Sequence, residues 1–261
     1  MEPLNKRKIP RLYLIIRNFL RRLKRKLTRN YQAPTYISSA PHSLKLFKEI
    51  LLTFKTDPRI NFISMENYLD NRINLGKINI LVRHDIDTSE CAERINKITQ
   101  IEEELGVVSN IYWLVSEHSY KLKDVAEKVK YFSQKGFTQG LHTIAHITDD
   151  QQAAFEKELD IFKMNFLFHP KTFTMHGYMP RGEDYEKKRL RFIKLLRKLK
   201  SFYRVDSDNL DTPYYEKVYH DAPINYNSKQ NSMISEDFFL IADFNKRGDR
   251  ILLLIHPGYW G

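Results

Sequence analysis

A regular alternation of two kinds of segment is the feature that most constrains how this chain can fold. From residue 43 onward, amphipathic segments of helical period are separated by short runs of apolar residues. Repeated strand and helix units predict a parallel sheet covered by helices, either a barrel or an open doubly wound sheet. We expect helices at 43–55, 89–106, 121–136, 149–166 and 185–200, and strands at 77–82, 107–115, 137–147, 171–177, 201–207 and 250–260.

Size and cysteine content narrow the class of protein. A chain of 261 residues with 42% hydrophobic residues can bury one substantial core. Its single cysteine, Cys91, excludes an intramolecular disulfide and any zinc site built from several cysteines. Because nothing then points to an oxidising compartment, we expect a cytosolic protein.

The basic charge of the chain is concentrated at one end. Residues 1–30 contain eleven Lys or Arg and one Glu, a net charge of +10 out of the chain's +11. Apolar residues recur there at intervals of three and four, which predicts a basic amphipathic helix. Packing on the rest of the chain is one alternative for this helix, and nucleic acid is a less expected partner. We favour an anionic membrane surface, contacted through Arg17, Arg21, Arg22, Lys24 and Arg25.

Two carboxylates end the first expected strand of the sheet. The segment ILVRHDID, residues 80–87, contains Asp85 and Asp87 after Arg83 and His84. Side chains two apart in a strand point the same way, and parallel α/β folds place their chemistry at the carboxyl ends of strands. Two carboxylates on one surface repel each other unless a cation lies between them or one is protonated. The alternative is that Asp87 caps the next helix and Asp85 pairs with a base such as Arg83.

Three histidines lie where other expected strands run into loops. His142 and His146 can converge on one metal ion if the residues between them make one helical turn. With an Asp carboxylate they would form a three-ligand set that leaves positions for water. His256 follows five apolar residues and is a candidate acid or base. Each of these histidines could instead fill a polar pocket in the core.

Taken in order, these motifs resemble one known family. RHDID, HTIAH and LIHP are similar to motifs of the NodB-homology polysaccharide deacetylases, carbohydrate esterase family 4, in its bacterial surface-polysaccharide branch. The resemblance covers roughly residues 78–260. It implies an α/β fold, a distorted (β/α) barrel of the polysaccharide deacetylase type, over residues 78–261. Residues 31–77 would be a linker with a lead-in helix and strand, and residues 1–30 the basic amphipathic N-terminal helix.

The resemblance also implies a divalent metal ion and a set of roles. Zinc is the expected metal, with cobalt, nickel or manganese as alternatives. Asp85 would be the general base and His256 the general acid. Because one residue separates Asp85 from Asp87, where the family usually has adjacent carboxylates, their roles could be exchanged. The implied metal ligands are Asp87, His142 and His146.

In two supporting motifs the chain departs from the family pattern. The family's arginine that orients the base has no direct counterpart in TMHGYMPRGED, which follows the expected strand at 171–177. The acidic residue that orients the general acid is only suggested by YRVDSDN. The expected supporting residues for the base are Arg83 and His84 in the first motif, and His176 and Arg181 in TMHGYMPRGED. Those for the general acid are Asp206 or Asp208.

The expected function is therefore that of a metal-dependent hydrolase. It would remove an N-acetyl or similar N-acyl group from an amino sugar during the biosynthesis of a cell-surface glycan such as lipopolysaccharide or capsule. The substrate would be lipid-linked if the N-terminal helix binds the inner face of the cell membrane. A catalytically silent glycan-binding or membrane-associated scaffold with the same fold is the alternative.

Overall fold

The computed structural model describes residues 42–70, 72–115, 119–170, 172–177, 183–203, 206–207, 217–221, 231–233 and 248–261, all within the unit Ser39–Gly261. The expected basic helix lies outside these residues, together with the arginines and lysine expected at a membrane surface, Arg17, Arg21, Arg22, Lys24 and Arg25. None of the described helices is long and apolar enough to span a membrane.

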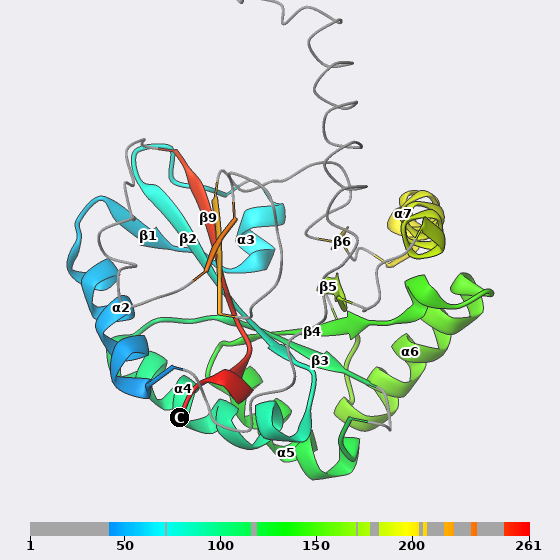
Figure 1. Cartoon of the computed structure of the whole chain (residues 1–261), viewed down its shortest axis with the longest axis horizontal. Coiled ribbons are helices and arrows are strands. Elements are labelled where there is room, and N and C mark those ends of the chain that lie inside the picture. The colour runs from blue at the N-terminus through cyan, green and yellow to red at the C-terminus, as the bar shows by residue number, and fades with distance from the viewer. Residues whose placement is uncertain are drawn as a thin grey trace, which may run out of the picture. The chain divides into compact units, whose positions relative to one another are not determined.

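One sheet of nine parallel strands forms the centre of the fold (Figure 1). Eight strands lie in the order β6-β5-β4-β3-β2-β9-β7-β8. β1 pairs with the first residues of β2, on the side where β3 pairs with its last ones. This is an α/β fold with a parallel half-barrel sheet. The strands are β1 Ile60–Phe62, β2 Ile78–Ile86, β3 Asn110–Leu114, β4 Thr138–Thr143, β5 Thr172–Met175, β6 Asp206–Ser207, β7 Lys217–His220, β8 Asn231–Met233 and β9 Arg250–Ile255.

Helices alternate with these strands, as the periodic pattern predicted. Ser43 caps the amino end of α2 through its side chain, and Gly106 ends α4 in the left-handed conformation, at φ 62°. Both boundaries were expected and are confirmed. The described helices are α2 Leu44–Thr56, α3 Met65–Leu69, α4 Ser89–Leu105, α5 Leu122–Gln134, α6 Gln151–Phe166 and α7 Glu183–Tyr203, with 3₁₀ turns η1 Ala145–Ile147 and η2 Pro257–Tyr259.

The predicted strand at 201–207 is wrong in its first half. Residues 201–203 continue α7, and Asp206–Ser207 form β6. The elements α3, β7 and β8 were not expected, because segments of three to five residues are too short to show a period.

The two faces of the sheet carry different residues because side chains alternate along each strand. In β9, Ile251, Leu253 and Ile255 belong to the large core under the helices. Leu252 and Leu254 point the other way and join a smaller cluster with residues of α3. We call the face with this smaller cluster the inner face. The candidate site lies on it.

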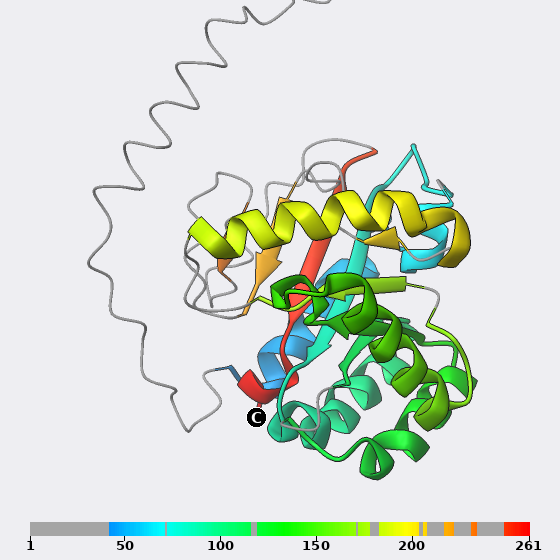
Figure 2. The same cartoon turned by 90° about the vertical axis from the view of Figure 1, so that its right-hand side faces the viewer.

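The parallel arrangement brings the carboxyl ends of β2, β4, β5 and β9 to one edge of the sheet. Residues that directly follow these strands therefore lie close together in space. The turn η1 continues from β4, and α7 packs on it. Figure 2 shows α7 as a long helix running beside the sheet. The edge thus carries the chain segments in which the sequence predicted a site.

Candidate metal and catalytic site

Arg83 and Asp85 form a buried ion pair on the inner face of β2. Arg83 donates from Nε and Nη2 to the two carboxylate oxygens of Asp85, each at 2.7 Å, and both residues are buried. The guanidinium also lies over the ring of Tyr112, 5.5 Å from its centroid. A bidentate pair holds the carboxylate in one orientation. Arg83 is therefore the cation that orients Asp85, and Arg181 lies outside the described residues.

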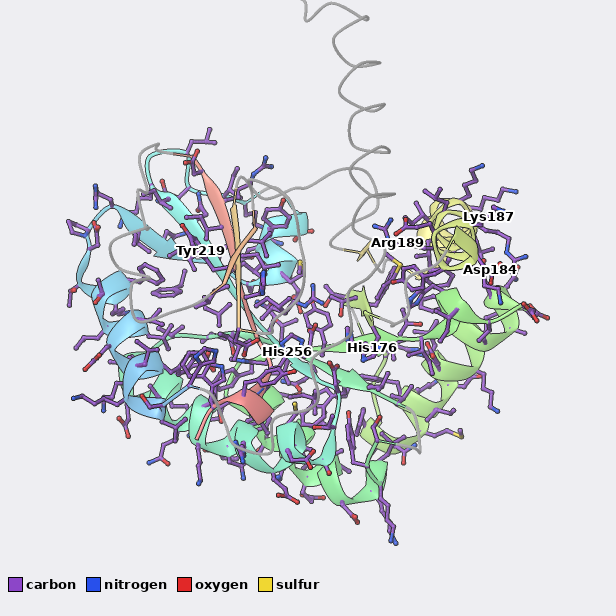
Figure 3. The ribbon with its side chains drawn as sticks, viewed as in Figure 1. His176, Asp184, Lys187, Arg189, Tyr219 and His256 are labelled. Carbon is purple, nitrogen blue, oxygen red and sulfur yellow. The ribbon has the colours of Figure 1, made fainter. Side chains whose placement is uncertain are left out.

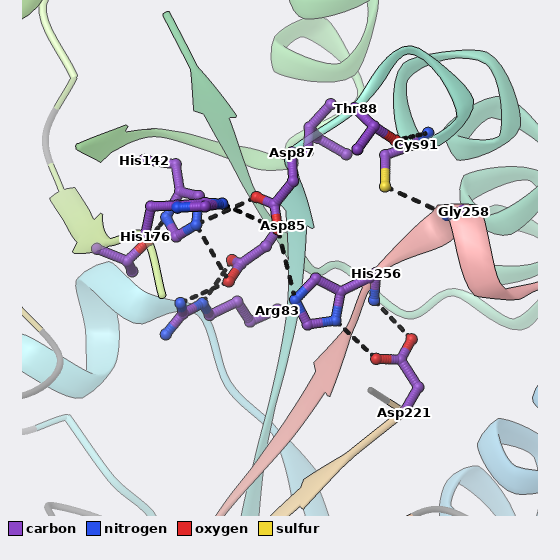
Figure 4. Close-up of polar contacts among 12 residues, drawn as sticks. Arg83, Asp85, Asp87, Thr88, Cys91, His142, His176, Asp221, His256 and Gly258 are labelled. Carbon is purple, nitrogen blue, oxygen red and sulfur yellow. Dashed lines mark hydrogen bonds and ion pairs between the residues drawn. The ribbon is translucent and has the colours of Figure 1, made fainter. Parts of the chain in front are cut away.

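Asp87 follows β2 and is the meeting point of three histidines. Its Oδ1 lies 3.2 Å from His142 Nε2, and its Oδ2 lies 3.6 Å from His176 Nε2 and 3.7 Å from His256 Nε2 (Figure 4). The neighbouring Thr88, rather than Asp87, caps α4 through its side chain. The alternative of a helix-capping Asp87 is thus excluded.

Three of these side chains form a group that can hold a metal ion. Asp87, His142 and His176 each offer one ligand atom, and these atoms all lie within 4.8 Å of one another. His176 reaches the group because its backbone N–H bonds to the carbonyl of Thr143 on the neighbouring strand, at 2.9 Å. One carboxylate and two imidazoles suit zinc and other divalent transition metals.

Two features of this group fit a bound cation. The Nδ1 of His142 is hydrogen-bonded to the Thr174 hydroxyl at 2.6 Å, so Nε2 is the nitrogen that faces Asp87. Asp87 Oδ1, which faces His142 Nε2 at 3.2 Å, is buried without a hydrogen-bond partner among the described residues. Buried polar atoms are normally satisfied. A ligand atom that approaches another without bonding to it is expected where a cation lies between them.

His146 does not join this group, contrary to the ligand set predicted from the sequence. β4 continues past His142, and the helical turn of η1 begins only at Ala145, so one helical turn does not connect the two histidines. The ring of His146 is fully buried and lies edge-on to Tyr185 of α7, with centroids 5.6 Å apart. Burial, together with the charges of His142 and His176, lowers the pKa of His146 to about 4.

His256 is held by Asp221, a residue that the sequence analysis missed. The Asp221 carboxylate accepts the backbone N–H of His256 at 2.6 Å and lies 2.7 Å from its Nδ1. Asp221 follows β7, which pairs directly with β9. The predicted partner Asp206 is in β6, separated from β9 by four strands, and Asp208 lies outside the described residues. The partner of His256 is thus corrected to Asp221.

His176 and His256 approach the site from opposite sides of β2. His176 follows β5, whereas His256 follows β9, and the two lie near each other in the middle of the fold (Figure 3).

The sequence offered a signal for Asp221 as well. Like Asp87 and His256, it directly follows a segment with apolar residues, here KVYH.

Surrounding cations keep the two carboxyl groups ionised. Burial by itself raises the pKa of Asp85, but the charges of Arg83 and His142 outweigh burial and lower it. At Asp87, burial also raises the pKa, but the neighbouring histidines outweigh it. These histidines, His142 foremost, hold the pKa of Asp87 well below its usual value. Asp85 and Asp87 can therefore both be carboxylates at neutral pH.

The carboxylates in turn raise the pKa of two histidines. Burial lowers the pKa of His256, but the charges of Asp221 and Asp87 outweigh this and raise it to about 9. Burial also works against His176, whose pKa is raised by its contact with Asp87. His256 is therefore a proton donor at neutral pH, as long as these contacts persist.

His84 faces away from the site, so its predicted supporting role there is wrong. Alternation along β2 places it on the helix-covered face, where its Nε2 lies 2.8 Å from Glu102 of α4. Both side chains are completely buried, and Glu102 also accepts a hydrogen bond from the Ser109 hydroxyl at 2.8 Å. This buried pair joins β2 to α4 behind the site.

Glu158 of α6 holds the chain between the two histidines of HTIAH. Its carboxylate accepts the Ile144 N–H at 3.1 Å and the hydroxyl of Thr143. Burial raises the pKa of Glu158 to about 7, although these hydrogen bonds oppose the rise. The sequence carried no signal for this role, because Glu158 is one of several acidic residues in an amphipathic helix.

Comparison with known proteins finds structural likeness at low sequence identity. No protein-family model and no curated protein matches the chain. It is similar to the solved structure of IcaB from Ammonifex degensii, with 15% identity and a TM-score of 0.38 over 59% of this chain and 71% of the other. It is also similar to the polysaccharide deacetylase Bc1974 from Bacillus cereus, with 13% identity and a TM-score of 0.37 over 68% of this chain and 78% of the other.

The structural similarity to polysaccharide deacetylases that the motifs predicted is thus found. At these TM-scores it leaves the chemistry to be argued from the side chains themselves.

The ligand group leads to a prediction about metal content. We expect His142→Ala and His176→Ala to weaken zinc binding by more than the roughly 10- to 100-fold that loss of a supporting residue costs. His146→Ala should keep its zinc, because its ring lies outside the group. The measurement is metal content after dialysis, with affinity from titration against a competing chelator. Zinc lost from His146→Ala but kept by His176→Ala would restore the ligand set predicted from the sequence.

The raised pKa of Glu158 leads to a prediction about stability and pH. A carboxyl group with a pKa of about 7 in the fold and 4.5 in the unfolded chain binds its proton more tightly when folded. Its contribution to stability is therefore lost as the pH rises from 4.5 through about 7. In urea unfolding of the metal-free protein, the free energy of unfolding should fall more steeply over this window in wild type than in Glu158→Gln. Equal slopes would contradict the raised pKa.

Proposed function

We propose that this chain is a metal-dependent hydrolase of the polysaccharide deacetylase type, which removes an N-acetyl or similar N-acyl group from an amino sugar. One arrangement carries the proposal. Asp85 lies 3.6 Å from His142, and His256 lies 3.7 Å from Asp87. A base, a metal-binding group and an acid therefore line one small space, which is a set of groups suited to metal-assisted amide hydrolysis.

Asp85 is the general base in this proposal. Each of its oxygens accepts one bond from Arg83, and an ionised carboxylate has about four acceptor positions. Positions therefore remain with which Asp85 can take a proton from the attacking water. Its contact with Arg83 keeps it ionised and oriented, so Asp85 is ready to accept that proton.

His256 is the general acid. Asp221 binds the Nδ1 side of the ring and leaves Nε2 facing the site. An amine must be protonated to leave, since its anion is a very poor leaving group. A histidine with a pKa of about 9 carries that proton at neutral pH. The protonated His256 therefore favours amide substrates over esters of good leaving groups.

A divalent ion held by Asp87, His142 and His176 would supply the Lewis acidity that polarises an acyl carbonyl and acidifies a water molecule. Two imidazoles and one carboxylate form the ligand set of several catalytic zinc sites. We therefore propose zinc, with cobalt, nickel and manganese as alternatives.

The substrate follows from the motifs and from the composition of residues 1–30. The resemblance of RHDID, HTIAH and LIHP to the deacetylase motifs supports an acetylated amino-sugar glycan of lipopolysaccharide or capsule assembly. The basic residues of segment 1–30 support attachment to the inner face of the cell membrane, where such glycans are built on lipid carriers. The proposed enzyme is accordingly cytoplasmic and peripheral.

Acetate release tests the function directly. Zinc-loaded wild type should release acetate from N-acetylated amino sugars, free or lipid-linked. Asp85→Asn should lower kcat by about 10²- to 10⁴-fold, because a general base contributes that much, while its zinc content stays unchanged. Asp124→Asn, the same substitution at an exposed position of α5, is the matched control and should keep wild-type activity. Release should be followed by an enzymatic acetate assay with zinc, cobalt, nickel and manganese in turn.

Absence of acetate release with every metal, together with retained glycan affinity, would contradict the enzymatic function. That result would instead favour a silent glycan-binding scaffold. Equal activity of Asp85→Asn and Asp124→Asn would remove Asp85 from the chemistry.

A further inference from the structure

The carboxylate of Asp221 binds more than the histidine that it orients. Its Oδ2 accepts the indole N–H of Trp260 at 2.7 Å as well as the backbone N–H of His256. Its Oδ1 faces the His256 ring. Asp221 is 1% exposed and Trp260 is 0% exposed. A buried carboxylate bound by three donors cannot rotate unless it breaks hydrogen bonds that no water replaces.

Trp260 is itself held by two other rings. It packs edge-on against Phe47 of α2, with centroids 5.4 Å apart, and against the ring of His42, at 4.8 Å. His42 forms a parallel bridge with Trp260, and its Nε2 lies 3.2 Å from the backbone carbonyl oxygen of Asp221. The segment before α2 and the end of the chain thus hold Asp221 in place.

We infer that Trp260 is a positioning residue for the general acid, acting through Asp221. The inference rests on the proposed function. In that reaction the oxygen of water bonds to the acyl carbon, Asp85 takes a proton of the water, and the C–N bond breaks. The proton on His256 Nε2 passes to the leaving nitrogen. Because this transfer requires hydrogen-bond distance, a displaced Asp221 would slow the transfer and leave substrate binding unchanged.

A purely structural role for Trp260 makes a different demand on the side chain. Filling the core between Phe47 and His42 requires only an aromatic ring, whereas fixing Asp221 requires the indole N–H. Trp260→Phe separates the two roles, because it keeps a ring and removes the donor. Trp113→Phe is the matched control. Trp113 is equally buried and donates its indole N–H at the same distance, 2.7 Å, but to Gln139 on the helix-covered side.

The closing experiment compares two substrates with the zinc-loaded proteins. An N-acetylated amino sugar needs its leaving amine protonated, whereas 4-nitrophenyl acetate does not. Trp260→Phe should lower kcat on the amide by roughly 10- to 100-fold, a part of the contribution of a general acid, with KM unchanged. Hydrolysis of the aryl ester should stay within about threefold of wild type. Trp113→Phe should show no such difference between the two substrates. The inference is overturned if Trp113→Phe also loses amide hydrolysis selectively, or if Trp260→Phe shows no selective loss.

A second readout does not depend on activity. In ¹⁵N-labelled protein, the Nδ1 proton of His256 should resonate far downfield because of its short bond to Asp221. This signal should shift or broaden in Trp260→Phe and stay unchanged in Trp113→Phe. If wild type releases no acetate, the proposed function fails by itself, and an unchanged His256 signal in Trp260→Phe still overturns the inference.

Should Trp260→Phe not fold, a tryptophan analogue with sulfur in place of the ring N–H, introduced at position 260, keeps the shape of the indole. The same two readouts then apply to the analogue. A wild-type ratio of amide to ester hydrolysis and an unchanged His256 signal would overturn the inference.

Discussion

Two carboxylates at the end of one strand, the buried Asp85 and the partly buried Asp87, are the constraint around which the rest of the site is arranged. They point to the same face because strand side chains repeat every second residue. Each has partners of its own, the Arg83 guanidinium for Asp85 and three histidine rings for Asp87. Loss of one partner would leave a buried charge unpaired, which costs several kcal/mol. Asp85 and Asp87 therefore depend on these partners, and a divalent ion held by Asp87, His142 and His176 would be a further partner for Asp87.

Residues on the helix-covered face, on α6 and after neighbouring strands hold these side chains in place. On the helix-covered face of β2, His84 pairs with Glu102, and in α6 the carboxylate of Glu158 holds the chain after His142. On the other side, Asp221 holds His256 and accepts the indole N–H of Trp260. None of these partners belongs to the metal group itself. The fold separates the proposed reacting side chains on the inner face from supporting side chains anchored in helices and neighbouring strands, which is the support that a catalytic constellation requires.

Local features of the sequence were enough to predict most of the fold, because helix and strand periods are local properties. They also singled out Asp85, Asp87, His142 and His256, four residues at the ends of apolar runs that the structure brings together. The partners of these residues depend on strand order, which no local pattern contains. Asp221 was missed because only the pairing of β7 with β9 brings it to His256.

His146 was assigned to the metal for a related reason. Its spacing from His142 suits a helix, but the chain is still a strand at His142 and turns only at Ala145. The pairing of β4 with β5 brings His176 beside His142 instead.

The most direct test of the central claim is therefore a crystal structure of the zinc-loaded protein, measured at the zinc absorption edge. We expect one anomalous peak about 2.0–2.2 Å from Asp87, His142 Nε2 and His176 Nε2. A peak bound by His146 in place of His176, or no peak between these side chains, would contradict it.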